Sequence, residues 1–237
     1  MSSMTLLALD TATEACSVAL RIGGEVRARF EVAGRSHTQQ LVPMARALMA
    51  EAGIGFAQLD GYVCGVGPGS FAGVRIGVSF IKGLALAHER PVVPVSSLQM
   101  LALPPMRDGA TRVLTAIDAR MDEVYFAAWQ RDADGLPQMI GDACVSAPAQ
   151  IGAHPGEWQA AGSGWQAYRA ALETASAATL LTCDGAALPR AADALALAAP
   201  RFAAREFICA AELVPQYLRN KVALTLDEQR ARRAQRG

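Results

Sequence analysis

The chain has 237 residues, of which 52% are hydrophobic, and its 22 Lys and Arg balance 22 Asp and Glu. This length suits one large domain or two small ones and is enough to bury a substantial core. Because the formal net charge is zero, no overall field attracts nucleic acid or an acidic membrane, and any RNA contact must be local or supplied by a partner.

Targeting and redox signals favour a cytosolic protein. The opening MSSMTLLALDTATE has no basic region ahead of its apolar stretch, so no secretory signal is expected. No apolar run reaches the roughly 20 residues that span a bilayer. The five cysteines are widely spaced without a CxxC pair, which is typical of reduced thiols and not of a disulfide framework or a zinc site. We therefore expect a cytoplasmic location and no membrane contact.

The predicted elements of the first half alternate between strands and helices. Three opening runs, joined by turn residues, predict an antiparallel meander over residues 5–10, 15–21 and 25–32. A helix follows over 38–52, in which Pro43 requires either a start near Gln40 or a kink. The later predicted elements are a buried strand over 59–66, a helix over 72–88, a strand over 91–95 and a helix that begins at 96.

The second half repeats the opening pattern. Two prolines and an Asp-Gly pair over 104–109 mark the best boundary. After it, a strand over 112–118 ends in Asp118, as the first strand ends in Asp10. A small polar turn and a second strand over 123–131 follow. This similarity indicates an internal duplication.

The rest of the second half has a weaker pattern. The Ala-rich region 141–200 predicts alternating helices and strands. The final LDEQRARRAQRG is polar and basic, and it predicts a solvated helix. An RNA contact of this tail is the alternative.

The stretch GVGPGSFAGVRIGVSF at 65–80 gathers glycines where a strand leads into a helix. Exposed N–H groups and the dipole of a helix start suit an anion, and Ser70 is a candidate N-cap. The stretch is neither a Walker A loop nor a Rossmann fingerprint. Anion binding and a plain strand-to-helix turn therefore both stay open. The candidate nucleotide or anion ligands are Asp10, Thr11, Gly67, Gly69 and Ser70.

The two longest predicted helices have wider apolar faces than one sheet requires. On helix 72–88 the apolar arc spans about 200°, whereas somewhat over 100° suffices for a one-sided surface helix. Gly73 and Gly77 would let another helix approach closely. The surplus predicts either a protein–protein interface or mutual burial of the two helices. The candidate interface residues are Leu41, Met44, Leu48, Gly73, Ile76, Gly77, Phe80 and Leu84.

No catalytic set is evident in the sequence. The three histidines have no ligand spacing such as i, i+4, so a histidine metal site is not expected. No serine lies in a GxSxG motif, although a Ser–His–Asp set stays open. Asp10 and Asp118 each end a strand, where carboxylates often meet a nucleotide or metal, but a single acid is also a common turn former. We therefore assign no catalytic residue and no metal ligand.

Six motifs occur in the order LLALDTATEACSVAL, SHTQQLVPMARALM, GVGPGSFAGVRIGVSFIKGLA, VPVSSLQMLA, AIDARMDEVYFA and VPQYLRN. In this order they resemble the TsaB (YeaZ) family of bacterial proteins for threonylcarbamoyladenosine (t6A) modification of tRNA. The resemblance is dense over residues 4–130 and is then limited to the last motif. GPGSFAGVRIG is its most specific part.

The resemblance implies an α/β fold of the actin/Hsp70-like (ASKHA, ribonuclease H-like) class, with two related lobes of mixed sheets flanked by helices. It implies an N-terminal lobe over 1–105, which carries the helices that bind a partner or a second copy. The C-terminal lobe is expected over 106–237, with a last helix that could pack back on the N-terminal lobe.

The resemblance also implies a paralogue, TsaD, whose catalytic site has an HxxxH metal pair. Here Ser97 and Leu101 stand in place of the two histidines, and leucine cannot coordinate a metal. The implied function is therefore that of a pseudo-enzyme. It would be a non-catalytic scaffold subunit that binds and activates TsaD for t6A formation at position 37 of ANN-decoding tRNAs, and it would need no cofactor.

The implied partners are TsaD, the ATPase TsaE through the TsaB–TsaD pair, tRNA indirectly, and a second copy of the chain when TsaD is absent. Two enzymatic alternatives stay open. The first is an ATP-dependent small-molecule kinase or ATPase of the ASKHA class that uses Asp10 and the glycine loop. The second is a protease, against which the missing HxxxH pair argues.

Overall fold

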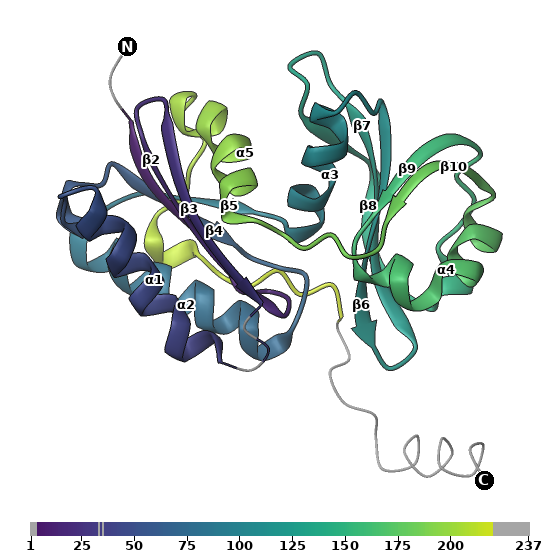
Figure 1. Cartoon of the computed structure of the whole chain (residues 1–237), viewed down its shortest axis with the longest axis horizontal. Coiled ribbons are helices and arrows are strands. Elements are labelled where there is room, and N and C mark those ends of the chain that lie inside the picture. Colours follow the sequence, from purple (N-terminus) through teal and green to yellow (C-terminus); the bar gives the residue numbers. More distant parts are fainter. Residues whose placement is uncertain (1–3, 33, 35, 220–237) are drawn as a thin grey trace, which may run out of the picture.

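The computed structural model describes residues 4–32, 34 and 36–219, and it contains two five-stranded sheets that stand side by side (Figure 1). In the first sheet the strand order is β3-β2-β1-β4-β5. The first three strands form the predicted antiparallel meander, and β1, β4 and β5 are parallel. The bounds are β1 Thr5–Asp10, β2 Ala15–Ile22, β3 Glu25–Val32, β4 Gly61–Gly65 and β5 Val92–Val95.

The second sheet repeats the first. Its order is β10-β9-β6-β7-β8, which is the order of the first sheet when β6 to β10 are counted as strands one to five. The directions also agree, because β6, β7 and β8 are antiparallel while β6, β9 and β10 are parallel. The predicted internal duplication is therefore confirmed. The bounds are β6 Arg112–Arg120, β7 Glu123–Arg131, β8 Pro137–Ser146, β9 Gly156–Ala161 and β10 Ala178–Asp184.

Helices cover both sheets, and two of them are exchanged between the sheets (Figure 1). α1 (His37–Glu51) and α2 (Phe71–His88) cover one face of the first sheet, and α4 (Ser163–Ser176) covers one face of the second. α3 (Ser97–Arg107) follows the first sheet in sequence but packs on the second, whereas α5 (Ala191–Ala203) follows the second sheet and packs on the first. Short 3-10 turns lie at Phe56–Gln58, Pro148–Gln150 and Ala210–Glu212.

We call the first sheet with α1 and α2 the first lobe, and the second sheet with α4 the second lobe. The expected division between residues 105 and 106 falls inside α3, which contacts both the second sheet and α5. The exchange explains why β1 is apolar on both faces. Leu7 and Leu9 pack in the core toward α1 and α2, whereas Leu6 and Ala8 pack in the core toward α5.

The prolines within α1 and α3 do not end these helices, although the sequence predicted a helix start or boundary near them. Of the two alternatives for Pro43, a helix start near Gln40 is wrong, because α1 begins at His37. Pro43 lies in the second turn on the exposed side. Because proline has no N–H, the backbone carbonyl four residues earlier lacks its usual helical hydrogen bond. On the exposed side of the helix, water can hydrate this carbonyl. The predicted boundary over 104–109 is likewise mostly helical, because Pro104 and the next proline lie inside α3 between buried side chains that pack on both sheets.

Among the described helices, α2 alone has the length and composition to cross a membrane. Such a test is also passed by the core helix of a globular domain. The side chains of Val74, Val78 and Ile81 are buried against the first sheet, as expected for a core helix. The predicted helical tail and its RNA alternative lie outside the described residues.

Residues 207–219, which contain a 3-10 turn but no α-helix or strand, return from α5 along α2 to the second lobe, and we call this segment the strap. Ile208 exchanges two backbone hydrogen bonds with Val92, at 2.9 and 3.0 Å. The Lys82 ammonium of α2 donates to two strap carbonyls, at 2.8 and 3.2 Å. At the far end, Arg219 donates to a carbonyl of β6 at 3.2 Å and pairs with an acid of β7. The strap therefore ties the two lobes together.

Candidate functional site: the cleft between the lobes

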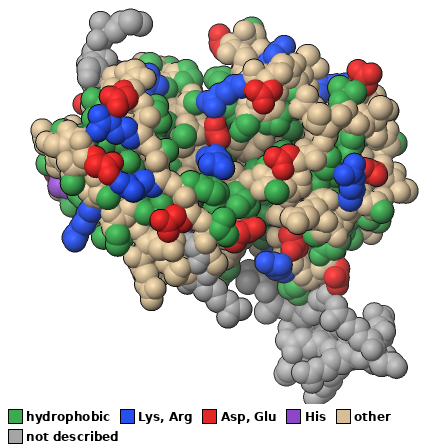
Figure 2. All heavy atoms as spheres, viewed as in Figure 1, with side chains coloured by type: hydrophobic (Ala, Val, Ile, Leu, Met, Phe, Trp, Pro, Cys, Tyr) green, Lys and Arg blue, Asp and Glu red, His purple; other side chains and the backbone are tan. Residues whose placement is uncertain are grey.

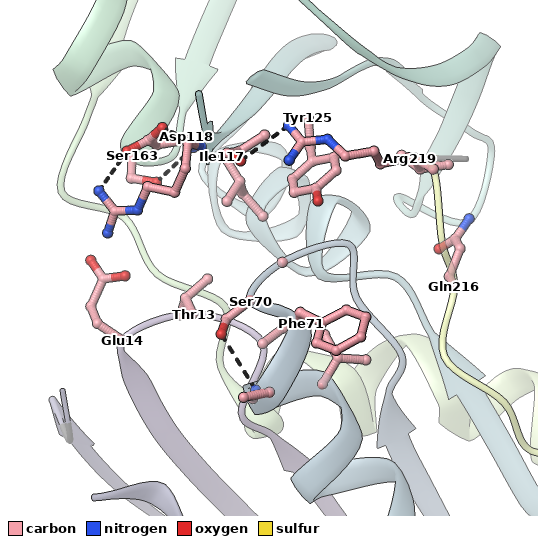
Figure 3. Close-up of a pocket in the computed structure, with 18 of the residues that line it drawn as sticks. Thr13, Glu14, Ser70, Phe71, Ile117, Asp118, Tyr125, Ser163, Gln216 and Arg219 are labelled. Carbon is pink, nitrogen blue, oxygen red and sulfur yellow. Dashed lines mark hydrogen bonds and ion pairs between the residues drawn. The ribbon is translucent and has the colours of Figure 1, made fainter. Parts of the chain in front are cut away.

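A cavity of about 890 Å³ opens between the two lobes. Its first-lobe wall is the turn after β1 together with the start of α2, and its second-lobe wall is the end of β6 together with the start of α4. The strap lines one side. Figure 3 shows Glu14 and Ser70 of the first lobe facing Asp118 of the second across this cavity.

The glycines at the start of α2 allow close packing within the first lobe. A Cβ at Gly69 would collide with the carbonyl of Ala12, and one at Gly73 would collide with the carbonyl of Thr11. The Ser70 N–H, which an anion would need, already donates to the Ala12 carbonyl at 2.6 Å. Ser70 Oγ accepts the Gly73 N–H at 3.4 Å, so the predicted N-cap is confirmed. These contacts favour the strand-to-helix turn, and anion binding stays a prediction.

Asp10 lies beneath the cleft and does not line it. Its side chain is 1% exposed, and its carboxylate accepts hydrogen bonds from the Ala12 N–H at 3.0 Å and from Ser97 Oγ at 3.1 Å. A Cβ at Gly65 of β4 would overlap this carboxylate, so only glycine leaves room for it. Burial raises the pKa of Asp10 to about 6, although the two hydrogen bonds act in the opposite direction.

Two other candidate ligands are also occupied by the chain itself. Thr11 is 1% exposed, and its hydroxyl donates to the Gly73 carbonyl at 2.7 Å. The Gly67 carbonyl accepts the Ser97 N–H at 2.8 Å. In this structure Thr11 therefore bonds to the start of α2, while Asp10 and Gly67 bond to the start of α3. Nucleotide or anion binding by these three residues stays a prediction. Of the five candidates, Gly69 and Ser70 line the cavity.

Ser97 and Leu101 occupy the first two turns of α3. Ser97 is fully buried and bonded to Asp10, whereas Leu101 is 2% exposed and packs in the core of the second sheet. A hydroxyl that already donates to a carboxylate and an apolar isobutyl group cannot form a metal site. Within the described residues, no group of three or more His, Cys, Asp or Glu side chains could hold a metal ion.

Asp118 is the strand-ending acid that does reach the cleft. Its carboxylate accepts the Arg120 backbone N–H at 2.8 Å and pairs with the Arg120 guanidinium at 2.9 Å. Its own N–H donates to Ser163 Oγ at the start of α4, at 3.1 Å. The Arg120 side chain is 84% exposed, so solvent screens this ion pair. Asp118 is thus held by its own turn and by α4.

A second glycine turn in the second lobe was missed by the sequence reasoning. A Cβ at Gly162 would collide with the Ala116 carbonyl, and one at Gly164 would lie 2.7 Å from the Ala116 Cβ. These glycines let α4 start directly against β6, as the glycines of α2 do against the turn after β1. The sequence signal for this turn is the GSG at 162–164, which follows a strand. It is shorter than the glycine-rich stretch before α2.

The candidate interface residues divide into buried and partly buried groups. Leu41, Met44 and Leu48 are at most 6% exposed and belong to the core between α1 and the first sheet. Gly73 and Gly77 are buried against the chain's own Thr11. The contacts of these five residues lie inside the lobe, and their role in an interface stays a prediction. The partly buried members, which keep exposed surface on α2, are Ile76, Phe80 and Leu84.

An aromatic and cationic cluster at the mouth of the cleft was also missed. Phe71 and Tyr217 are 52% and 48% exposed, with ring centroids 6.2 Å apart. The guanidinium of Arg75 lies 3.2 Å from the centroid of the Phe71 ring and 5.3 Å from that of Tyr217. The signal was present in the FAGVR and VPQYLR motifs, but nothing local to either motif shows that the two meet.

Comparisons with known proteins place the chain in one sequence family. The family model of TsaD, tRNA N6-adenosine threonylcarbamoyltransferase, matches residues 29–225. The chain is 42% identical over 226 residues to the tRNA threonylcarbamoyladenosine biosynthesis protein TsaB of Escherichia coli, with 93% of this chain and 96% of that protein covered. It is 38% identical to the protein of the same name from Haemophilus influenzae, with 94% and 96% covered.

A solved structure supports the same grouping. YeaZ from Pseudomonas aeruginosa matches with a TM-score of 0.84 and 41% sequence identity, covering 91% of this chain and 100% of that chain. A second structure from the same organism, described as similar to peptidase YEAZ, matches equally well. Together with the two duplicated sheets, these matches confirm the expected actin/Hsp70-like (ASKHA) fold class.

Proposed function

The chain belongs to the TsaB (YeaZ) family of tRNA threonylcarbamoyladenosine biosynthesis proteins, and we propose that it acts there as a non-catalytic subunit. In this proposal it binds and activates the TsaD catalytic subunit, which forms t6A at position 37 of ANN-decoding tRNAs. The pair then recruits the ATPase TsaE, and tRNA is engaged mainly through the partners. The chain works in the cytoplasm and needs no cofactor.

The observation that carries the non-catalytic assignment is the sealing of Asp10. A carboxylate that is to bind a metal ion or nucleotide must reach solvent, but Asp10 is 1% exposed and is bonded to Ser97. Leu101, one turn further along α3, packs its apolar side chain in the core of the second sheet. These features also argue against the kinase or ATPase alternative, because Asp10 was its main candidate carboxylate.

The partner surface that we propose is the outer face of α2. Ile76, Phe80 and Leu84 recur at a spacing of four residues and are only partly buried, so they form a ridge along the helix. Gly83 and Ala87 are exposed beside this ridge and leave room for close approach of another helix. Apolar surface of this kind is the usual centre of an interface. In the absence of TsaD, the same ridge can pair with a second copy.

The test is light scattering after size exclusion, for the chain alone and mixed with TsaD from the same organism. We expect a one-to-one complex to replace the free species. Reconstituted t6A synthesis should then depend on both proteins. Separate elution of the two proteins, with or without ATP, would refute the subunit proposal.

A substitution of Phe80 to Asp should weaken the complex at least tenfold, because it would bury an unpaired charge at the interface. Since Phe80 also touches the core of the first lobe, Ala87→Arg is a second variant that blocks the exposed side of the ridge without removing a core contact. Leu86→Asp is the matched control, because Leu86 is 55% exposed and lies about 120° around the helix from Phe80. Unchanged TsaD affinity in both test variants would remove α2 from the interface.

A further inference from the structure

The cluster formed by Phe71, Arg75 and Tyr217, which we call the aromatic platform, is more exposed than its chemistry predicts. Each ring leaves about half of its surface in solvent, whereas aromatic side chains normally supply core packing. The platform joins the start of α2 to the strap, and both rings line the mouth of the cavity between the lobes. Figure 3 shows Phe71 beside the strap, on the side of the cavity where Gln216 lies.

The platform is not required to hold the strap. The strap is already fixed by its backbone bonds to Val92 and by the two bonds from Lys82. A further backbone bond joins Gln216 to the Val66 carbonyl at 2.8 Å, next to Tyr217. Because the strap is anchored without Tyr217, the exposed rings of Tyr217 and Phe71 favour a binding role for the platform over a structural one.

The charge of the platform is uncompensated. Among the described residues, no carboxylate lies within ion-pair distance of Arg75, whereas Arg120 and Arg219 are both paired with acids. Gln166 and Gln216 line the same cavity, and neither side-chain amide has a hydrogen-bond partner in the described part of the chain. The site therefore offers flat aromatic and guanidinium faces beside free amide donors and acceptors, which are the groups that recognise unpaired nucleobases.

The charge pattern on one face of the protein bears on the kind of RNA that the platform fits. On the body of the protein, acidic and basic side chains are interspersed over the face that Figure 2 shows, without a large patch of one sign. A double helix, which is recognised mainly through its backbone, finds no extended positive surface on this face.

We propose that the aromatic platform stacks the bases of single-stranded RNA. The inference rests on the proposed function, because it makes the loop of a tRNA the RNA that the chain meets, and it adds a direct contact to the indirect one. Base stacking on Tyr217 and on the Arg75–Phe71 stack is tolerant of sequence, so the contact holds an unpaired loop without choosing its bases.

The test is fluorescence anisotropy with the full chain, alone and in complex with TsaD. The probes are a labelled single-stranded 12-mer RNA, an anticodon stem-loop and a duplex of the same length as the 12-mer. We expect the single strand and the stem-loop to bind at least tenfold more tightly than the duplex. Phe71→Leu and Tyr217→Leu, which keep apolar bulk but remove the π face, should each weaken single-strand binding about tenfold.

Phe207→Leu is the matched control, because Phe207 is an aromatic residue of the strap that is 37% exposed but packs on Phe202 away from the platform. It should leave RNA affinity unchanged. Single-strand affinity that is unchanged in both platform variants, or equal affinity for the duplex, would overturn the proposal.

Light scattering of every variant with TsaD separates this inference from the proposed function. If the variants form the complex normally and lose RNA, both ideas stand. If they lose TsaD but keep RNA, the platform is a protein contact and the RNA proposal is overturned. If the wild-type chain fails to bind TsaD, the proposed function falls, and the measurements on the chain alone still decide the RNA contact.

Discussion

The two lobes share one strand order and one set of strand directions, yet their corresponding acids differ completely in environment. Asp10, at the end of β1, is sealed by β4 and by the start of α3. Asp118, near the end of β6, reaches the cleft and pairs with an exposed arginine. The difference teaches that topology fixes where a strand-ending acid stands, while the packing around it decides whether it can act on a ligand.

The same comparison applies to the helices. In the first lobe, α1 and α2 both cover the outer face, whereas the corresponding link between β8 and β9 in the second lobe contains a short 3-10 turn in place of a helix like α1. The first lobe therefore has a broad two-helix surface, and the second has a single helix. This asymmetry is why we place the partner surface on the first lobe.

The largest expected effect concerns the buried acid. Because the pKa of Asp10 is raised in the folded chain from 3.8 to about 6, its contribution to stability is full below about pH 4 and is lost as the pH rises through 6. Asp10→Asn removes this loss, so the stability of the variant relative to wild type should rise by about 3 kcal/mol between pH 4 and pH 8. Urea unfolding at both pH values measures the difference.

If the unfolding free energies of the variant and the wild type differ by the same amount at both pH values, burial does not raise the pKa of Asp10. The same variant also tests the lack of chemistry at this site. We expect Asp10→Asn to keep TsaD binding and t6A synthesis, and a loss of synthesis with an intact complex would revive an enzymatic role for the first lobe.

The second effect concerns the glycine turns. In Gly73→Ala the new Cβ would meet the Thr11 carbonyl, which belongs to the backbone and cannot rotate away, so we expect a loss of about 2 kcal/mol. Gly164→Ala should cost a similar amount in the second lobe. Gly83→Ala on α2 is the matched control, because its Cβ would meet nothing within 4 Å and should stabilise the helix by up to about 1 kcal/mol. Chemical denaturation of the three variants measures their free energies of unfolding and so ranks their stabilities.

The smallest effect belongs to the exposed acid. Asp118→Asn removes an ion pair with a largely exposed Arg120, while the amide oxygen can still accept the Arg120 N–H. The expected loss is below about 1 kcal/mol and should disappear in 1 M salt. A larger, salt-independent loss in denaturation experiments would mean that Asp118 has a structural role comparable to that of Asp10.

Much of the fold could be predicted from the sequence, because its signals are local. The meander, the strand over 123–131 and the helix after the glycine stretch were predicted within a few residues of their observed ends. The candidate site has weaker local signals. Leu41, Leu48 and Gly73 have the pattern of an interface, but the same pattern arises when a helix packs on its own sheet and turn.

The sequence by itself determined the alternation of elements, the duplication and the family, since these follow from periodicity, turn residues and motifs that lie close together in the chain. Only the tertiary structure decided the exchange of α3 and α5 between the sheets, the burial of Asp10 by Ser97, and the meeting of Phe71 with Tyr217. Each of these joins residues that are tens of positions apart or more. Such contacts are set by how whole elements pack, and no local pattern records them.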